Sequence, residues 1–278
     1  MHFNDCLRNF EVLKTIMENT HYISSDLLSI ETINSIISND YKLALSEEAK
    51  VNIVKCRSYL DAKMLSNDIP IYGINTGFGS LCNVKISDEN LSKLQENLVK
   101  SHACGTGDEV PYEIVKIMLL LKIQSLSYGH SGVQLVTVER LIDFYNNDIL
   151  PIIYTLGSLG ASGDLAPLAH LALPLLGEGE VNMNGFRQPA SKALQKMGWE
   201  PIVLQSKEGL ALLNGTQFMS AYGVYNLIKA EKLSYLADVI GAISLEGFDG
   251  RIEPFTDLIH LVRPHKGQVV TAERMRDL

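Results

Sequence analysis

Residues 157–163, Gly157-Ser-Leu-Gly-Ala-Ser-Gly163, constrain the backbone more than any other part of the chain. Ser162 lies between Ala161 and Gly163, the two smallest residue types, and further glycines precede them. A backbone this small can fold tightly enough for the Gly163 nitrogen to approach the Ala161 carbonyl, a contact that bulkier residues would block. Such a turn can cyclise and dehydrate into an electrophile, which none of the twenty side chains provides.

Ordinary explanations of this run must be weighed against that chemistry. Gly and Ser are common in turns, and Asp164 is a candidate cap for a helix that follows it. A serine-hydrolase elbow needs a glycine two residues after the serine, where this chain has Asp164. A dinucleotide loop needs Gly-x-Gly-x-x-Gly, whereas Gly157, Gly160 and Gly163 are spaced by three. The hydrolase and dinucleotide patterns are therefore excluded, and a simple turn remains as the alternative.

Composition limits the class of protein and its partners. The chain has 278 residues, of which 46% are hydrophobic and 20% charged, enough for a large core. A net charge of -8 argues against nucleic acid or an anionic membrane as a partner. The apolar run Ile117–Leu121 is far too short to span a bilayer. Scattered cysteines, no metal-ligand spacing and no signal-peptide pattern at the N-terminus predict a cytoplasmic protein without a metal site.

Helical periodicity dominates the hydrophobic pattern and predicts a mainly α fold. Ser46 is a candidate N-cap, a second helix is expected from Ser87, and Pro111 suits the first position of a third. Two more helices are expected at about 133–145 and 216–245. The only expected strands are 70–74 and a hairpin that turns at Asn184-Gly185.

The pattern also suggests how the chain is divided. We expect a small mixed N-terminal region, residues 1–205, that leads into the start of a long-helix bundle at 206–278. The last eight residues form an amphipathic helix pattern that stops without a cap, a glycine or a proline.

Three further segments combine glycines with a side chain suited to chemistry. They are Tyr72-Gly-Ile-Asn-Thr-Gly-Phe-Gly79, Ser101-His-Ala-Cys-Gly-Thr-Gly107 and Glu208-Gly-Leu-Ala-Leu-Leu-Asn-Gly-Thr-Gln217. Each also has a structural interpretation: a tight turn with a buried Tyr72, a His102 stabilised by a helix C-terminus, and a turn or cap at Asn214.

Together with the sixteen residues 157–172, these segments resemble the signature of the histidine and phenylalanine ammonia-lyase family. The resemblance implies that Ala161, Ser162 and Gly163 become a 4-methylideneimidazol-5-one (MIO) group without any added cofactor. That group would serve as the catalytic electrophile. In one departure from the pattern, Tyr154-Thr-Leu156 replaces a Pro-Leu-Lys-like tripeptide before the glycine run.

The resemblance also implies roles for three side chains. Tyr72 would remove a proton from the substrate β-carbon, which requires an environment that favours phenolate because free tyrosine has a pKa of about 10. His102 would lie near the substrate side chain, and the Asn214 amide would polarise the MIO ring. The Ser101-His102 pair resembles that of histidine ammonia-lyases, and some tyrosine-selective relatives are similar here.

The implied activity is deamination of L-histidine to trans-urocanate and ammonia. A tyrosine or phenylalanine ammonia-lyase and an MIO-dependent 2,3-aminomutase remain alternatives, as does an inactive helical fragment. Family members are homotetramers of about twice this length, with sites built from three subunits, so the chain resembles an N-terminal half. We therefore expect an amino acid as the small-molecule ligand and no lyase activity from these 278 residues alone.

Overall fold

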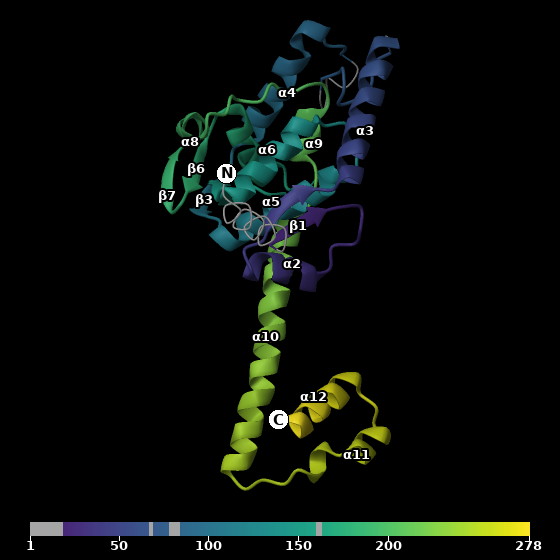
Figure 1. Ribbon diagram of the computed structural model, residues 1–278, viewed down its shortest axis with the longest axis vertical. Helices are drawn as coiled ribbons and strands as arrows, with labels where there is room; N and C mark the ends of the chain where they lie inside the picture. Colours follow the sequence, from purple (N-terminus) through teal and green to yellow (C-terminus); the bar gives the residue numbers. More distant parts are fainter. Residues whose placement is uncertain (1–18, 67–68, 78–83, 160–162) are drawn as a thin grey trace, which may run out of the picture. The chain divides into compact units, whose positions relative to one another are not determined.

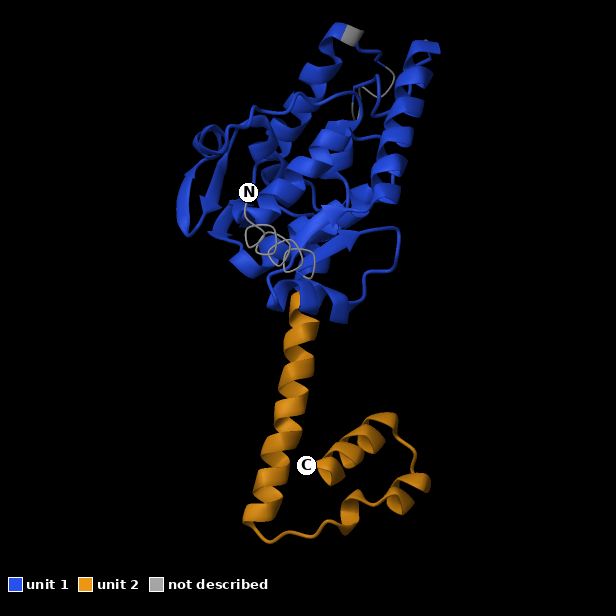
Figure 2. Ribbon diagram, in the orientation of Figure 1, with its two compact units in different colours: residues 1–223 blue, residues 224–278 orange. Residues whose placement is uncertain are grey.

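The computed structural model describes residues 19–66, 69–77, 84–159 and 163–278. The chain divides into two compact units, Met1–Gly223 and Val224–Leu278 (Figure 2). The mainly α fold with a small mixed region is confirmed (Figure 1). The predicted division of the chain into domains 1–205 and 206–278 stays a prediction.

The first unit contains eight complete α-helices within its described residues and the first turns of a ninth. They are α2 (Ile30–Ser38), α3 (Glu47–Ser66), α4 (Asp88–His102), α5 (Tyr112–Ser127), α6 (Leu135–Asn146), α7 (Leu165–Ala172), α8 (Ala190–Met197), α9 (Glu208–Leu213) and the beginning of α10 (Gln217–Gly247). A 3-10 turn, η2 (Leu173–Leu176), continues α7.

Short strands form three small sheets in the first unit. β1 (Thr20–Ile23) pairs in parallel with β2 (Lys42–Leu45), and β3 (Thr106–Glu109) pairs antiparallel with β5 (Tyr154–Leu156). The third sheet has the order β4 (Ile149–Pro151), β6 (Glu180–Met183), β7 (Phe186–Pro189). The β6–β7 hairpin and α3 lie on opposite sides of this unit (Figure 1).

Helix α5 is the centre of the core. Its buried residues lie on every side of the helix, and Met118, Leu119 and Ile123 are completely buried. A helix that is apolar all round is stable only when other elements surround it. Helices α3 and α6 pack against it. The core is therefore built around a helix that is buried on every side.

Local sequence signals place several elements as predicted. The Ser46 hydroxyl accepts a hydrogen bond from the Ala49 N–H at 3.1 Å, so Ser46 caps α3. The hairpin turn is also confirmed: Asn184 and Gly185 have φ angles of 53° and 84°, as a type I′ turn requires. Pro111 differs by one position: it occupies the N-cap position of α5, before the first helical residue, and makes no side-chain capping bond.

The predicted strand at residues 70–74 is wrong. These residues form a turn in which the Ile74 N–H donates to the Ile71 carbonyl. Gly73 has φ +72°, a conformation outside the strand region. The Asn75 side chain closes the turn, because its Oδ1 accepts a hydrogen bond from the Ile71 N–H at 2.6 Å. A side chain that satisfies the local backbone replaces the ladder that a strand would need.

The second unit contains the rest of α10, the 3-10 turn η3 (Glu253–Phe255), α11 (Asp257–Leu261) and α12 (Lys266–Asp277). Arg274 on α12 pairs with Asp238 on α10 at 2.7 Å. Ala272 is the one buried residue among 224–278, all of which are described. Several apolar residues of α10 are uncovered, and Ile240 and Ile243 are well exposed.

None of the helices in the described ranges combines the length and the apolar composition needed to cross a bilayer.

Two glycines, Gly129 in the turn after α5 and Gly185 in the β6–β7 turn, should differ in how much an alanine substitution destabilises the fold. A Cβ on Gly129 would lie 2.6 Å from the Asn52 carbonyl carbon, whereas a Cβ on Gly185 would meet nothing within 4 Å. Both glycines have positive φ. We expect Gly129→Ala to lower the free energy of unfolding by more than about 2 kcal/mol and Gly185→Ala by about 1 kcal/mol. Chemical denaturation measures both, and equal losses would contradict the steric argument.

Candidate active site

Gly163 packs directly against the backbone of Gly215. Gly163 has φ +97°, and a Cβ on it would lie only 2.4 Å from the Gly215 oxygen. The next residue, Asp164, donates its backbone N–H to that same oxygen at 2.9 Å. Only glycine therefore fits at position 163. Ala161 and Ser162, the other two residues of the predicted electrophile, lie outside the described residues.

Asn214 is brought to this contact by α9. It is the C-terminal cap of α9, and its side-chain amide donates to the Leu210 carbonyl at 3.0 Å. The following Gly215 has φ +146°, and a Cβ there would lie 2.1 Å from Gln217 Oε1. That Oε1 atom is buried without a hydrogen-bond partner among the described residues. The structure thus places two of the predicted segments, 157–163 and 208–217, in backbone contact.

His102 ends α4, and its orientation is set by the helix. Its Nδ1 lies 2.9 Å from the Leu98 carbonyl and 3.2 Å from the Ser101 hydroxyl. Because a carbonyl oxygen can only accept, Nδ1 carries the hydrogen in this arrangement. In the neutral ring, Nε2 then remains as an acceptor.

The loop after His102 also reaches the glycine run. The Gly105 N–H donates to Nε2 of His170, on α7, at 3.0 Å. Gly157 approaches so closely that a Cβ on it would lie 3.1 Å from the Gly105 Cα. Burial lowers the pKa of His170, which keeps the ring neutral and Nε2 available as an acceptor. Three predicted segments therefore converge on the start of α7.

Tyr72 stands apart from these contacts. It lies in the turn that replaces the predicted strand, and its residue surface is 57% exposed. The alternative interpretation of this segment, a tight turn with a buried Tyr72, is right about the turn and wrong about the burial. Among the described residues, the contacts that join Gly105, Gly157, Gly163 and Gly215 come from segments other than the Tyr72 turn.

Asp164 has a role that the sequence did not reveal. It precedes α7, but its side chain makes no capping bond to that helix. Instead, Oδ2 accepts the Met219 N–H at 3.0 Å and Oδ1 accepts the Ser158 hydroxyl at 2.8 Å. Met219 lies in the first turn of α10, where backbone N–H groups lack partners within the helix. The Asp164 side chain therefore caps α10 rather than α7.

Two further buried charges hold α9. Glu208 is the first residue of α9 and is completely buried. Its carboxylate accepts four hydrogen bonds of 2.6–2.8 Å, from the backbone N–H groups of Gln134 and Gln205, the Thr137 hydroxyl and the Gln134 side-chain amide. At the other end, Lys122 Nζ donates to the carbonyls of Ala211 and Asn214. The sequence signal for Lys122 is a charge that directly follows the apolar run Ile117–Leu121.

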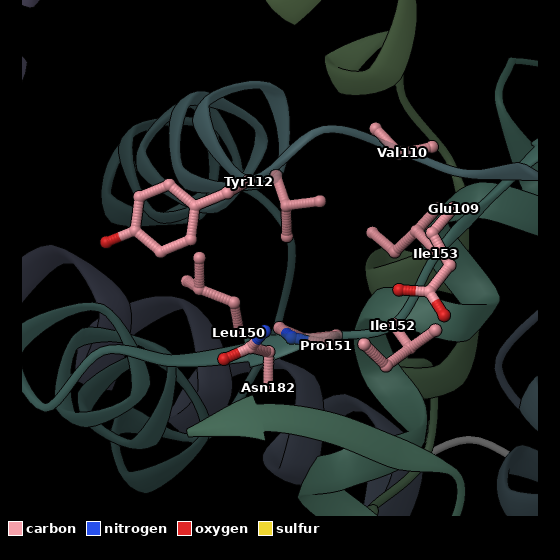
Figure 3. A pocket seen from close by; sticks show the side chains of 9 residues that line it. Glu109, Val110, Tyr112, Leu150, Pro151, Ile152, Ile153 and Asn182 are labelled. Atoms are coloured by element: carbon pink, nitrogen blue, oxygen red, sulfur yellow. The ribbon is translucent and has the colours of Figure 1, made fainter. Parts of the chain in front are cut away.

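The cavity in Figure 3 is separate from these contacts. Its volume is about 80 Å³, well below the roughly 300–1,000 Å³ of typical small-molecule pockets. Tyr112 and Val115 of α5, Leu150 of β4 and Asn182 of β6 contribute to its walls (Figure 3). None of the residues that line it is a predicted site residue. Among the described residues, no three His, Cys, Asp or Glu side chains form a cluster that could hold a metal ion.

Comparison with known proteins defines the class. The family model for aromatic amino acid lyases matches residues 28–278. The chain therefore belongs to the aromatic amino acid lyase family.

Individual relatives narrow the comparison. Histidine ammonia-lyases from Myxococcus xanthus and Bacillus subtilis are each 45% identical, over 91% and 90% of this chain. The structure is similar to histidine ammonia-lyase from Trypanosoma cruzi, with a TM-score of 0.84 and 37% identity over 93% of this chain and 50% of that one. It is also similar to a tyrosine aminomutase from Streptomyces globisporus, with a TM-score of 0.85 and 32% sequence identity. That match covers 92% of this chain and 48% of the aminomutase chain. The chain spans about half the length of the curated relatives it matches.

The capping role of Asp164 predicts the effects of two substitutions. In Asp164→Ala the Met219 N–H and the Ser158 hydroxyl both lose their acceptor, so we expect a loss of about 1–3 kcal/mol in the free energy of unfolding. Ser158→Ala removes only the hydroxyl partner and should lose about 1 kcal/mol or less. Hydrogen exchange at Met219 should accelerate in Asp164→Ala and stay slow in Ser158→Ala. Equal exchange in both variants would contradict the cap.

The burial of Lys122 predicts a pH dependence of stability. Desolvation lowers the pKa of Lys122 from 10.5 to about 7, so between these values the unfolded chain binds more protons than the folded one. Stability contributed by this group therefore increases with pH across that window. Relative to Lys122→Met, the wild type should gain unfolding free energy from pH 7 to pH 9. A difference that is flat with pH would contradict the assignment.

Proposed function

We propose that Ala161, Ser162 and Gly163 form an MIO group and that this chain supplies part of a histidine ammonia-lyase site. The observation that carries the proposal is the backbone contact between Gly163 and Gly215. It holds the last residue of the tripeptide where a side chain would not fit, beside Asn214. The names of the curated relatives support histidine as the substrate.

Such a group would supply an electrophile, which the protein side chains lack. Asn214 would hydrogen-bond to it through its exposed amide. His102, with Nδ1 engaged by Leu98, would offer Nε2 to an imidazole N–H of the substrate. Tyr72 would take the β-proton, with the amine of histidine leaving as ammonia.

The exposure of Tyr72 and of the apolar residues of α10 indicates which parts of the site this chain leaves uncovered. A proton acceptor that must work as phenolate needs neighbours that stabilise the anion, yet Tyr72 is more than half exposed. The apolar residues of α10, such as Ile240 and Ile243, are also uncovered. We propose that a longer chain and other subunits of a cytoplasmic homotetramer enclose both. The division into 1–205 and 206–278 belongs to the same proposal.

Intact mass tests the formation of the electrophile. The full-length protein should be lighter than its sequence by two water molecules, because cyclisation and dehydration each release one. Ser162→Ala should remove this difference and lower histidine deamination by at least about 1,000-fold. The control Ser191→Ala, at an exposed position on α8, should retain both. An unmodified wild-type mass would refute the proposed function.

Product analysis separates the possible reactions. With the full-length protein we expect urocanate from L-histidine, measured by its ultraviolet absorbance, and much slower turnover of tyrosine and phenylalanine. A tyrosine aminomutase is among the similar structures, so a β-amino acid product would instead assign the 2,3-aminomutase reaction. Cinnamate-type products would assign a tyrosine or phenylalanine lyase.

A further inference from the structure

Lys122 is a completely buried lysine that binds only backbone carbonyls among the described residues. Its Nζ donates to the carbonyl oxygens of Ala211 at 2.9 Å and Asn214 at 3.0 Å. No ion pair joins it to a carboxylate within the described ranges. By contrast Lys116, on the same helix α5, pairs with Asp40 at 2.8 Å.

Burying an amine without a nearby anion is unfavourable unless its hydrogens are hydrogen-bonded. The two carbonyl oxygens accept these hydrogens and so offset part of the cost of burial. The last carbonyls of a helix have no partner inside that helix. Ala211 and Asn214 lie at the end of α9, facing the core helix α5. An apolar residue at position 122 would leave both carbonyl oxygens without this donor on the core side.

One of these bonds fixes the peptide group directly before the Gly215 carbonyl, which contacts the electrophile-forming segment. The Asn214 carbonyl and the Gly215 nitrogen belong to one peptide unit. The Gly215 oxygen then accepts the Asp164 N–H, and Gly163 lies against it. Two hydrogen bonds, joined through Gly215, therefore connect Lys122 to the Asp164 N–H, which belongs to the peptide group that follows Gly163.

The backbone nitrogen of Gly163 is the atom that must react. In cyclisation it attacks the Ala161 carbonyl carbon, and its hydrogen moves to the carbonyl oxygen. This oxygen then leaves as water together with the Ser162 N–H hydrogen. A C=N bond forms between the former Ala161 carbonyl carbon and the Ser162 nitrogen. The Ser162 hydroxyl then leaves with the Ser162 Cα hydrogen as a second water, and a Cα=Cβ bond forms. No oxidant or external reactant is needed.

We infer that Lys122 is a positioning residue for this cyclisation. By fixing the Asn214–Gly215 peptide from the core side, it holds the surface against which Gly163 is pressed toward ring closure. Intramolecular reactions depend steeply on such placement, so a small relaxation of the turn slows closure greatly. The inference rests on the proposed MIO function and adds to it a residue that touches neither the substrate nor the tripeptide.

Mass spectrometry of matched variants tests this role. Lys122→Met removes the donors while keeping an unbranched buried side chain. Lys116→Met makes the same change on the same helix and removes the bond to Asp40. For each full-length protein, the folded fraction is isolated by size exclusion, and the proportion lighter by two waters is followed over time. We expect Lys116→Met to match the wild type and Lys122→Met to cyclise at least about tenfold more slowly.

A purely structural role makes a different prediction. It would lower the melting temperature of both variants and leave cyclisation of the folded molecules unchanged, and that result for Lys122→Met would overturn the inference. If Lys122→Met yields no folded protein, Lys122→Gln replaces it. Its side chain is too short to reach both carbonyls, so wild-type cyclisation in Lys122→Gln would equally overturn the inference. An uncyclised wild type would instead refute the MIO function itself.

Discussion

The close approach of Gly163 to Gly215 is the contact on which the candidate site depends. It joins the start of α7, the end of α9 and the start of α10, three helix ends from different parts of the sequence. A Cβ on Gly163 would clash with the Gly215 backbone, and Gly215 has a φ of +146°, which other residues rarely adopt. Because the two backbones can approach this closely only when position 163 lacks a side chain, one steric requirement determines both the local fold and the position of Gly163, the last residue of the predicted tripeptide.

Buried polar groups secure each helix end around this contact. Asp164 caps α10, Glu208 binds the residues before α9 and the start of α6, and Lys122 binds the end of α9. Helices as short as α7 and α9 are marginal alone, since few residues share the unfavourable nucleation of the first turn. Tertiary hydrogen bonds from buried charges provide the stability that their lengths do not. The same charges that stabilise these helices also position the segments with a chemical role.

In the second unit, by contrast, apolar side chains are exposed and polar contacts join the helices. Its helices expose large apolar side chains, such as Leu233, Ile240 and Ile243, while ion pairs such as Arg274–Asp238 join α12 to α10. Exposed apolar surface of this extent marks an interaction site in soluble proteins. This agrees with a chain that spans about half the length of its relatives and supports the proposal that further helices complete the site.

The sequence alone determined the elements that depend on neighbouring residues. Helical periodicity, the Ser46 cap and the Asn184-Gly185 turn all act over a few positions, and the glycine-rich segments identified the family. Only the tertiary structure decided that Asp164 caps a helix 55 residues away and that Lys122 binds carbonyls 89 and 92 residues away. It also replaced the strand at 70–74 with a turn closed by Asn75. Local propensities can be read from short windows, but the partner of a buried polar group depends on which distant backbone atoms the fold brings to it.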